Sequence, residues 1–210
     1  AMDDAGALDD PAPTMVFGMH VGPVPKGVVC YSVGVTYSAS VVLKITITGK
    51  QTHGSTPWGG IDPMPVAADI ISATGQIYRQ VPATDPMTIS IGHVEDQGRF
   101  NIIGGRLTLW GTIRSVHQHT MDDVQARITR TAEHIAGAYG ATAETAFLQP
   151  VPAVDNTPAW LSAGLPTLRR VVGDANVVEI PPQLGYDDVS VFVNKYGGLY
   201  LILGVQVTEL

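Results

Sequence analysis

The hydrophobic and polar positions follow their clearest pattern in the middle of the chain. Over Val41–Thr48, apolar residues alternate with lysine and threonine, which is the period-two pattern of a strand with one buried face. Asp62 and Pro63 are followed by apolar residues at spacings of three and four over Val66–Ile77. This stretch predicts an amphipathic helix with Asp62 as its N-cap and Pro63 at its first position.

Two further strands follow this helix. Apolar residues alternate with polar or glycine positions over Met87–Ile91 and again over Leu107–Ile113, and each run predicts a half-buried strand. A glycine-bearing turn over residues 98–105 connects the two strands.

A second helix and a weaker fourth strand complete the central pattern. Thr120–Asp123 resembles a capping box with Asp in place of Glu, apolar residues then recur at helical spacing, and Gly140 ends the helix. Ala143–Phe147 predicts the last strand. The order of elements over residues 40–149 is therefore β-α-β-β-α-β, the ferredoxin-like arrangement of two helices on one face of an antiparallel sheet.

The flanks on either side of this module have a different pattern. Residues 1–39 contain a short apolar strand, Val16–Val21. Residues 150–210 predict a helix through Trp160 and Leu168, followed by short apolar strands. Neither flank alone contains enough strand for a complete sheet. We therefore expect the flanks to be parts of one α/β layer that the central module interrupts.

Composition and charge narrow the class of protein. The chain has 210 residues, 45% of them hydrophobic and 15% charged, with a formal net charge of -7. This is a globular composition, and its acidic balance argues against a nucleic-acid-binding surface. The single Cys30 excludes an internal disulfide and a cysteine-based zinc knuckle. No apolar run reaches the ~20 residues of a membrane span, and the acidic N-terminal residues do not resemble a signal peptide, so we expect a cytoplasmic protein.

Three polar residues are candidates for a binding site. His53 lies in a Gly/Pro-rich loop between a predicted strand and helix, Asn101 lies in a glycine-bearing turn, and Arg114 lies at the end of a strand. Loop positions of this kind suit a ligand better than a core, and the three groups together suit an anion or a developing oxyanion. Each has a simpler explanation too: a solvated histidine, an asparagine that tolerates positive φ, and an arginine paired with a surface carboxylate.

The order of several motifs adds a resemblance to a known family. The chain resembles the metal-dependent amidohydrolases and carboxypeptidases, a family that includes hippurate hydrolases, N-acyl-amino-acid amidohydrolases and auxin-conjugate hydrolases. The matching motifs run almost from end to end in the family's order: Phe17-Gly18-Met19-His20-Val21, Gly49-Lys50-Gln51-Thr52-His53-Gly54-Ser55, Asp62-Pro63, Asn101-Ile102-Ile103, Gly111-Thr112-Ile113-Arg114 and Gly185-Tyr186-Asp187-Asp188-Val189-Ser190.

This resemblance implies an α+β chain in which a ferredoxin-like βαββαβ lid domain, residues 40–149, is inserted in part of an α/β metallohydrolase catalytic domain. Residues 1–39 and 150–210 would be segments of that catalytic domain. By the same resemblance the lid mediates a homodimer, and the enzyme hydrolyses the amide bond of N-acyl amino acids or small peptides.

The resemblance also implies roles for individual residues. His53 would match the lid histidine that reaches the partner subunit's active site and stabilises the tetrahedral oxyanion. Asn101 and Arg114 would match lid residues that hold the substrate carboxylate. His20 would match one ligand of a dinuclear metal centre, most often zinc. Asp187, which stands where the family has glutamate, is expected to interact with a helix N-terminus.

The sequence departs from the family pattern in one important respect. The family's other metal ligands and its general-base glutamate have no counterpart in these residues, while catalytic zinc needs at least three protein ligands. We therefore expect the chain to be a fragment of such an enzyme and to be inactive alone. The alternative is a non-catalytic module for dimerisation or small-ligand binding, because ferredoxin-like domains often serve those purposes without chemistry.

Overall fold

The computed structural model describes Met2 and residues 5–206, and their contacts divide the chain into two compact units. Unit 2 is Ser40–Pro150, and unit 1 combines the residues up to Ala39 with those from Val151 onward. The outermost positions of the two predicted flanks, residues 1, 3–4 and 207–210, lie outside the described residues. The assignment of the units as catalytic and lid domains stays a prediction.

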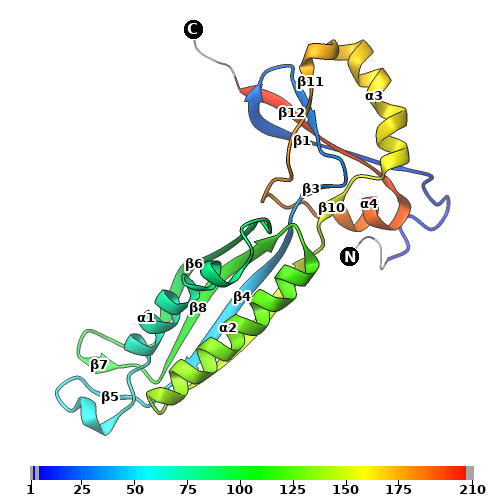
Figure 1. Cartoon of the computed structure of the whole chain (residues 1–210). Coiled ribbons are helices and arrows are strands. Elements are labelled where there is room, and N and C mark those ends of the chain that lie inside the picture. The colour runs from blue at the N-terminus through cyan, green and yellow to red at the C-terminus, as the bar shows by residue number, and fades with distance from the viewer. Residues whose placement is uncertain (1, 3–4, 207–210) are drawn as a thin grey trace. The chain divides into compact units, whose positions relative to one another are not determined.

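Unit 2 is a four-stranded sheet with two long helices (Figure 1). The sheet order is β6-β8-β4-β9, and α1 and α2 pack against each other and against β8. A separate two-stranded ribbon, β5 with β7, lies at one end of the unit (Figure 1). The elements are β4 (Ala39–Thr48), β5 (Thr52–His53), η1 (Pro57–Gly59), α1 (Pro63–Thr74), η2 (Ile77–Gln80), β6 (Met87–Asp96), β7 (Ile102–Ile103), β8 (Arg106–Ser115), α2 (Gln118–Ala138) and β9 (Thr142–Val151).

The core of unit 2 is formed by the apolar positions that the periodicity singled out. Leu43, Ile45 and Ile47 are fully buried in β4, as are Leu109 and Ile113 in β8. Burial of one such side chain stabilises the fold by about 1.5–3 kcal/mol, so the alternating strands account for much of the stability of this unit. All four strands predicted over residues 40–149 are present, although β6 and β9 are longer than predicted.

The two helices of unit 2 begin in different ways. In α1, the side chain of Asp62 accepts a hydrogen bond from the Met64 N–H at 2.9 Å, and Pro63 is the first helical residue, as the sequence predicted. The predicted capping box of α2 is wrong, because the helix begins at Gln118 and Thr120 is inside its first turn. The Thr120 hydroxyl donates to the Asp85 carboxylate instead of capping the helix.

Unit 1 is built from both flanks of the chain. Its sheet has the order β1-β12-β2-β11, in which β1 and β12 are parallel, and it buries Leu199 and Leu201 of β12 against Leu161 of α3. Each flank therefore contributes two strands to one sheet. The elements are β1 (Val16–Pro25), β2 (Val29–Tyr31), β3 (Val35–Tyr37), β10 (Val154–Asp155), α3 (Pro158–Val172), η3 (Asp174–Asn176), β11 (Val177–Glu179), α4 (Ser190–Tyr196) and β12 (Gly198–Gln206).

Candidate functional site

The ribbon at the end of unit 2 brings two of the candidate residues together. His53 of β5 is paired with Ile102 of β7, and the Gly54 N–H donates to the Asn101 carbonyl at 2.8 Å. His53 and Asn101 thus lie on neighbouring segments at the same end of the unit. We call this ribbon, with the loop 54–60 and the turn 98–101, the tip.

The ring of His53 is exposed and held in one orientation. Its Nδ1 accepts a hydrogen bond from the Ser55 N–H at 3.2 Å and lies 2.8 Å from the Ser55 Oγ. Because a backbone N–H can only donate, Nδ1 keeps its lone pair. The neutral ring must therefore carry its proton on Nε2, which makes the outward side of His53 a hydrogen-bond donor.

The loop that carries His53 is closed by its own hydrogen bonds. The Thr56 N–H donates to the His53 carbonyl at 2.9 Å, and the Thr52 hydroxyl donates to the Thr56 carbonyl at 3.0 Å. The loop also returns to the strand, because Lys50 and Ile61 exchange two backbone hydrogen bonds of 2.9 Å. The donor on His53 is thus positioned before any ligand arrives, which is what electrostatic stabilisation of a developing charge requires.

A shallow pocket of about 200 Å³ adjoins Asn101 at the tip. Its walls combine charged side chains, Asp62, Asp96 and Arg99, with apolar ones such as Met64. Phe100 beside it is fully exposed. The tip therefore offers both polar and apolar groups to a ligand.

Arg114 lies far from the tip within the same unit. It belongs to β8 and is in register with Thr88 of β6. Arg106, at the start of β8, follows the end of β7 in the tip by three residues. Arg114 is eight positions along the extended strand from Arg106, which corresponds to roughly 27 Å. In one copy of unit 2, Arg114 and the tip therefore lie at opposite ends of β8.

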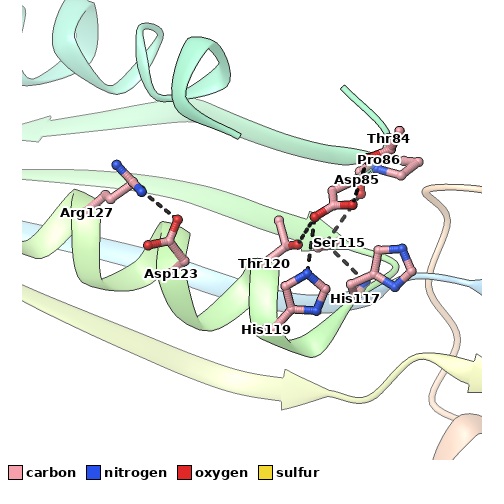
Figure 2. A network of polar contacts seen from close by, with 9 residues as sticks. All are labelled: Thr84, Asp85, Pro86, Ser115, His117, His119, Thr120, Asp123 and Arg127. Atoms are coloured by element: carbon pink, nitrogen blue, oxygen red, sulfur yellow. Dashed lines mark hydrogen bonds and ion pairs between the residues drawn. The ribbon is translucent and has the colours of Figure 1, made fainter. Parts of the chain in front are cut away.

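A network of polar side chains surrounds the Arg114 end of β8. Figure 2 shows the Asp85 carboxylate between the Thr120 hydroxyl, at 3.0 Å, and Nε2 of His119, at 3.2 Å. The hydrogen bond from Thr120, and then the contact with His119, lower the pKa of Asp85. The rings of His117 and His119 stack with centroids 5.4 Å apart. The network ties the segment before β6 to the first turn of α2.

His20 is in the interior of β1, which runs on to Pro25 beyond the predicted strand Val16–Val21. Nδ1 of its exposed ring lies 3.5 Å from the Asp187 carboxylate. That carboxylate also accepts hydrogen bonds from the Val189 N–H at 3.0 Å and from the Tyr200 hydroxyl at 2.8 Å. Burial, followed by the hydrogen bond to Asp187, raises the pKa of Tyr200, so its hydroxyl stays a donor.

Sequence reasoning found only part of this cluster. The contact of Asp187 with the backbone just before α4 agrees with the expected helix-terminal role. Its contact with His20 was missed, and so was Tyr200. Tyr200 is hidden in the apolar run of β12, and the periodicity of that run contains no signal that separates this side chain from its neighbours.

The donor set for a metal is incomplete in the part of the chain that the structure describes. A carboxylate next to Nδ1 of His20 is the arrangement that commonly orients a metal-binding histidine and leaves Nε2 for the metal. However, Met2 and residues 5–206 contain no group of three or more His, Cys, Asp or Glu side chains that could hold an ion. His20 alone does not make a metal site, so these residues do not fit a dinuclear centre.

Comparison with known proteins identifies the family. Residues 38–140 match the model of the peptidase dimerisation domain of the M20 peptidases. The chain is 33% identical over 194 residues to thermostable carboxypeptidase 2 of Saccharolobus solfataricus, which covers 91% of this chain and 49% of that protein. The chain thus carries an M20 peptidase dimerisation domain, and its relatives are hydrolases of that family. N-acetylcysteine deacetylase of Bacillus subtilis is another M20-type relative, 28% identical over 208 residues, or 98% of this chain and 54% of that protein.

Two solved structures share this fold. A dinuclear metal-binding M20 peptidase from Bacillus subtilis superposes with a TM-score of 0.76 and 26% identity, over the whole of this chain and 52% of its own. A tripeptidase from Staphylococcus aureus superposes with a TM-score of 0.70 and 24% identity, over 90% of this chain and 48% of its own, a likeness of fold alone.

The match to these proteins is partial in length. The chain spans about half the length of the curated M20 relatives that it matches. Among the described residues, no helix is both long and apolar enough to cross a membrane.

Proposed function

We propose that this chain is part of a metal-dependent M20 amidohydrolase or peptidase that acts on N-acyl amino acids or small peptides. In this proposal unit 2 is a ferredoxin-like lid, and it supplies contacts to the oxyanion and to the substrate carboxylate. The observation that carries the proposal is the exposed ring of His53, whose Nδ1 accepts a hydrogen bond from the Ser55 N–H. The order β-α-β-β-α-β and the sheet order β6-β8-β4-β9 support the assignment of the lid.

The substrate contacts divide between the two ends of unit 2. His53 donates a hydrogen bond to the carbonyl oxygen as it gains charge, where a preorganised donor lowers the barrier. Asn101 and the fork of Arg114 hold the carboxylate. Because roughly 27 Å of strand separates Arg114 from the tip, His53 and Asn101 of one copy act with Arg114 of another, and the functional form is a homodimer.

The catalytic centre itself needs more than the described residues. His20, oriented by Asp187, is one ligand of a zinc or other dinuclear centre in the complete enzyme. Since the described residues hold no group of three ligands, this chain alone does not hydrolyse an amide. The proposed location is the cytoplasm, with neither nucleic acid nor membrane as a partner.

A second candidate function follows from the same incomplete ligand set. The chain would be a non-catalytic module that dimerises or binds a small ligand through the ferredoxin-like unit. The missing ligand group favours it for the chain in isolation, whereas the preorganised His53 favours descent from an enzyme.

Ligand binding and turnover test these proposals together. We would measure binding of an N-acetyl amino acid and of its carboxamide, and hydrolysis in the presence of Zn²⁺ or Mn²⁺. We expect binding that requires the carboxylate, no turnover, and affinity about 10- to 100-fold weaker in Arg114→Ala, since a hydrogen bond to a charged group contributes about 1.5–3 kcal/mol. Equal binding of the carboxamide would contradict the role of Arg114, and turnover by this chain would contradict its inactivity.

A further inference from the structure

One tyrosine side chain covers part of the edge of the sheet in unit 2. Tyr78 lies in η2, between α1 and β6. Its hydroxyl oxygen accepts a hydrogen bond from the Ile89 N–H at 2.6 Å and donates one to the Ile89 carbonyl at 3.1 Å. Both backbone polar groups of this one strand residue are therefore bonded to a single side chain.

These two groups are the ones that an added strand would use. β6 is at the edge of the sheet, with β8 on its inner side. In an antiparallel pair, the N–H and C=O of alternate residues point toward the partner strand and those of the others point away. Since the groups of Ile89 reach Tyr78, they point away from β8, and by alternation so do those of Ile91. The Tyr78 hydroxyl thus occupies the outward N–H and C=O of Ile89. It makes no such hydrogen bonds to Ile91 in the described part of the chain.

The opposite edge of the sheet is less suited to pairing. Near the end of β9, Gln149 has a φ of 51° and is followed by Pro150, which has no N–H. By contrast, β6 and the two elements before it, α1 and η2, carry exposed apolar side chains. They are Ile71, Tyr78 and Val94, which are 39%, 42% and 43% exposed.

We propose that the Tyr78 hydroxyl is a stop on the β6 edge, so that a second copy of this chain pairs with β6 only over Ile91–Asp96. This inference rests on the proposed homodimer. A second copy is the occupant because unit 2 matches a dimerisation domain and because one copy separates His53 from Arg114. Pairing that included Ile89 would have to break both hydrogen bonds to Tyr78. The stop thereby limits the registers open to the two copies, and with them the distance from the tip of one copy to Arg114 of the other.

Cysteine crosslinking tests the register in the full chain. In a symmetric antiparallel pair, a residue on the twofold axis faces its own copy within the ~7 Å Cα separation that a disulfide tolerates. Single cysteines would be placed at each position from 91 to 96. Another would replace Ser90, because a twofold axis through Ser90 would pair Ile89 of one copy with Ile91 of the other. We expect an intermolecular disulfide within 91–96 and none for Ser90→Cys. The parent chain, whose Cys30 is buried, is the background control.

Removal of the hydroxyl completes the test. Tyr78→Phe should speed amide exchange at Ile89 at least 10-fold and allow Ser90→Cys to crosslink. Tyr139→Phe, which removes a hydroxyl bonded to Asp69 on the helices, should change neither. Crosslinking of Ser90→Cys with Tyr78 intact, in a chain of dimeric mass, would overturn the stop and leave the homodimer standing. A monomeric mass by light scattering at high concentration would overturn both.

Discussion

At the scale of single residues, hydrogen bonds to the backbone decide which chemistry each histidine offers. Nδ1 of His53 accepts from the Ser55 N–H, whereas Nδ1 of His134 lies 2.7 Å from the Arg130 carbonyl, which can only accept. The two rings must therefore hold their protons on opposite nitrogens. Of these two rings, only that of His53 is left with an Nε2–H donor, and His53 lies at the tip.

This difference can be read from one nitrogen NMR spectrum of the imidazoles. Above pH ~8, where histidines are neutral, we expect His53 as the Nε2–H tautomer and His134 as the Nδ1–H tautomer. Ser55→Ala keeps the backbone donor and should leave the tautomer of His53 unchanged. A His53 ring protonated on Nδ1 would remove the physical basis for its role as an outward donor.

At the scale of elements, the strength of the sequence signal followed the length of the element. The ten-residue strands and the helices of unit 2 repeat their apolar period several times, so their identity could be predicted. β5 and β7 have two residues each, too few for any periodicity, although they position His53 and Asn101. The start of α2 was predicted wrongly because Thr120 bonds to Asp85, which is distant in sequence.

The N-cap of α1 gives a direct test at this scale. Asp62→Ala removes the acceptor for the Met64 N–H and should lower the free energy of unfolding by about 1 kcal/mol. Asp123→Ala, which removes the exposed pair with Arg127 within α2, is the control and should change it by at most about 0.5 kcal/mol. Chemical denaturation measures both. Equal effects would contradict the capping role of Asp62.

The Asp85 network should make stability depend on pH in the acid range. Because the pKa of Asp85 is lowered in the folded state, its carboxylate stabilises the fold above its ordinary pKa of ~3.9. That contribution is lost as the pH falls through the lowered value. Asp85→Asn should therefore flatten the decline of the free energy of unfolding between pH 5 and pH 2. A decline as steep as that of the parent chain would show that another carboxyl is responsible.

At the scale of the whole molecule, the sequence pattern carries different information about the two units and about the side-chain clusters. The alternating pattern changes near residues 40 and 150, where the contacts also divide. The cluster of His20, Asp187 and Tyr200 joins residues about 180 positions apart through the pairing of β1 with β12. Local periodicity carries no information on such pairings. The separation of Arg114 from His53 likewise became visible only from the register of β8.

That separation makes the sharing of one ligand site between two copies the central claim. Mixing His53→Ala chains with Arg114→Ala chains tests it most directly, with binding of an N-acetyl amino acid as the measurement. A mixed dimer has one site with both residues intact if His53 and Arg114 come from different copies, and none if they come from the same copy. We expect each variant alone to bind weakly and the mixture to regain tight sites. A mixture that binds no better than its separate components would contradict the shared site.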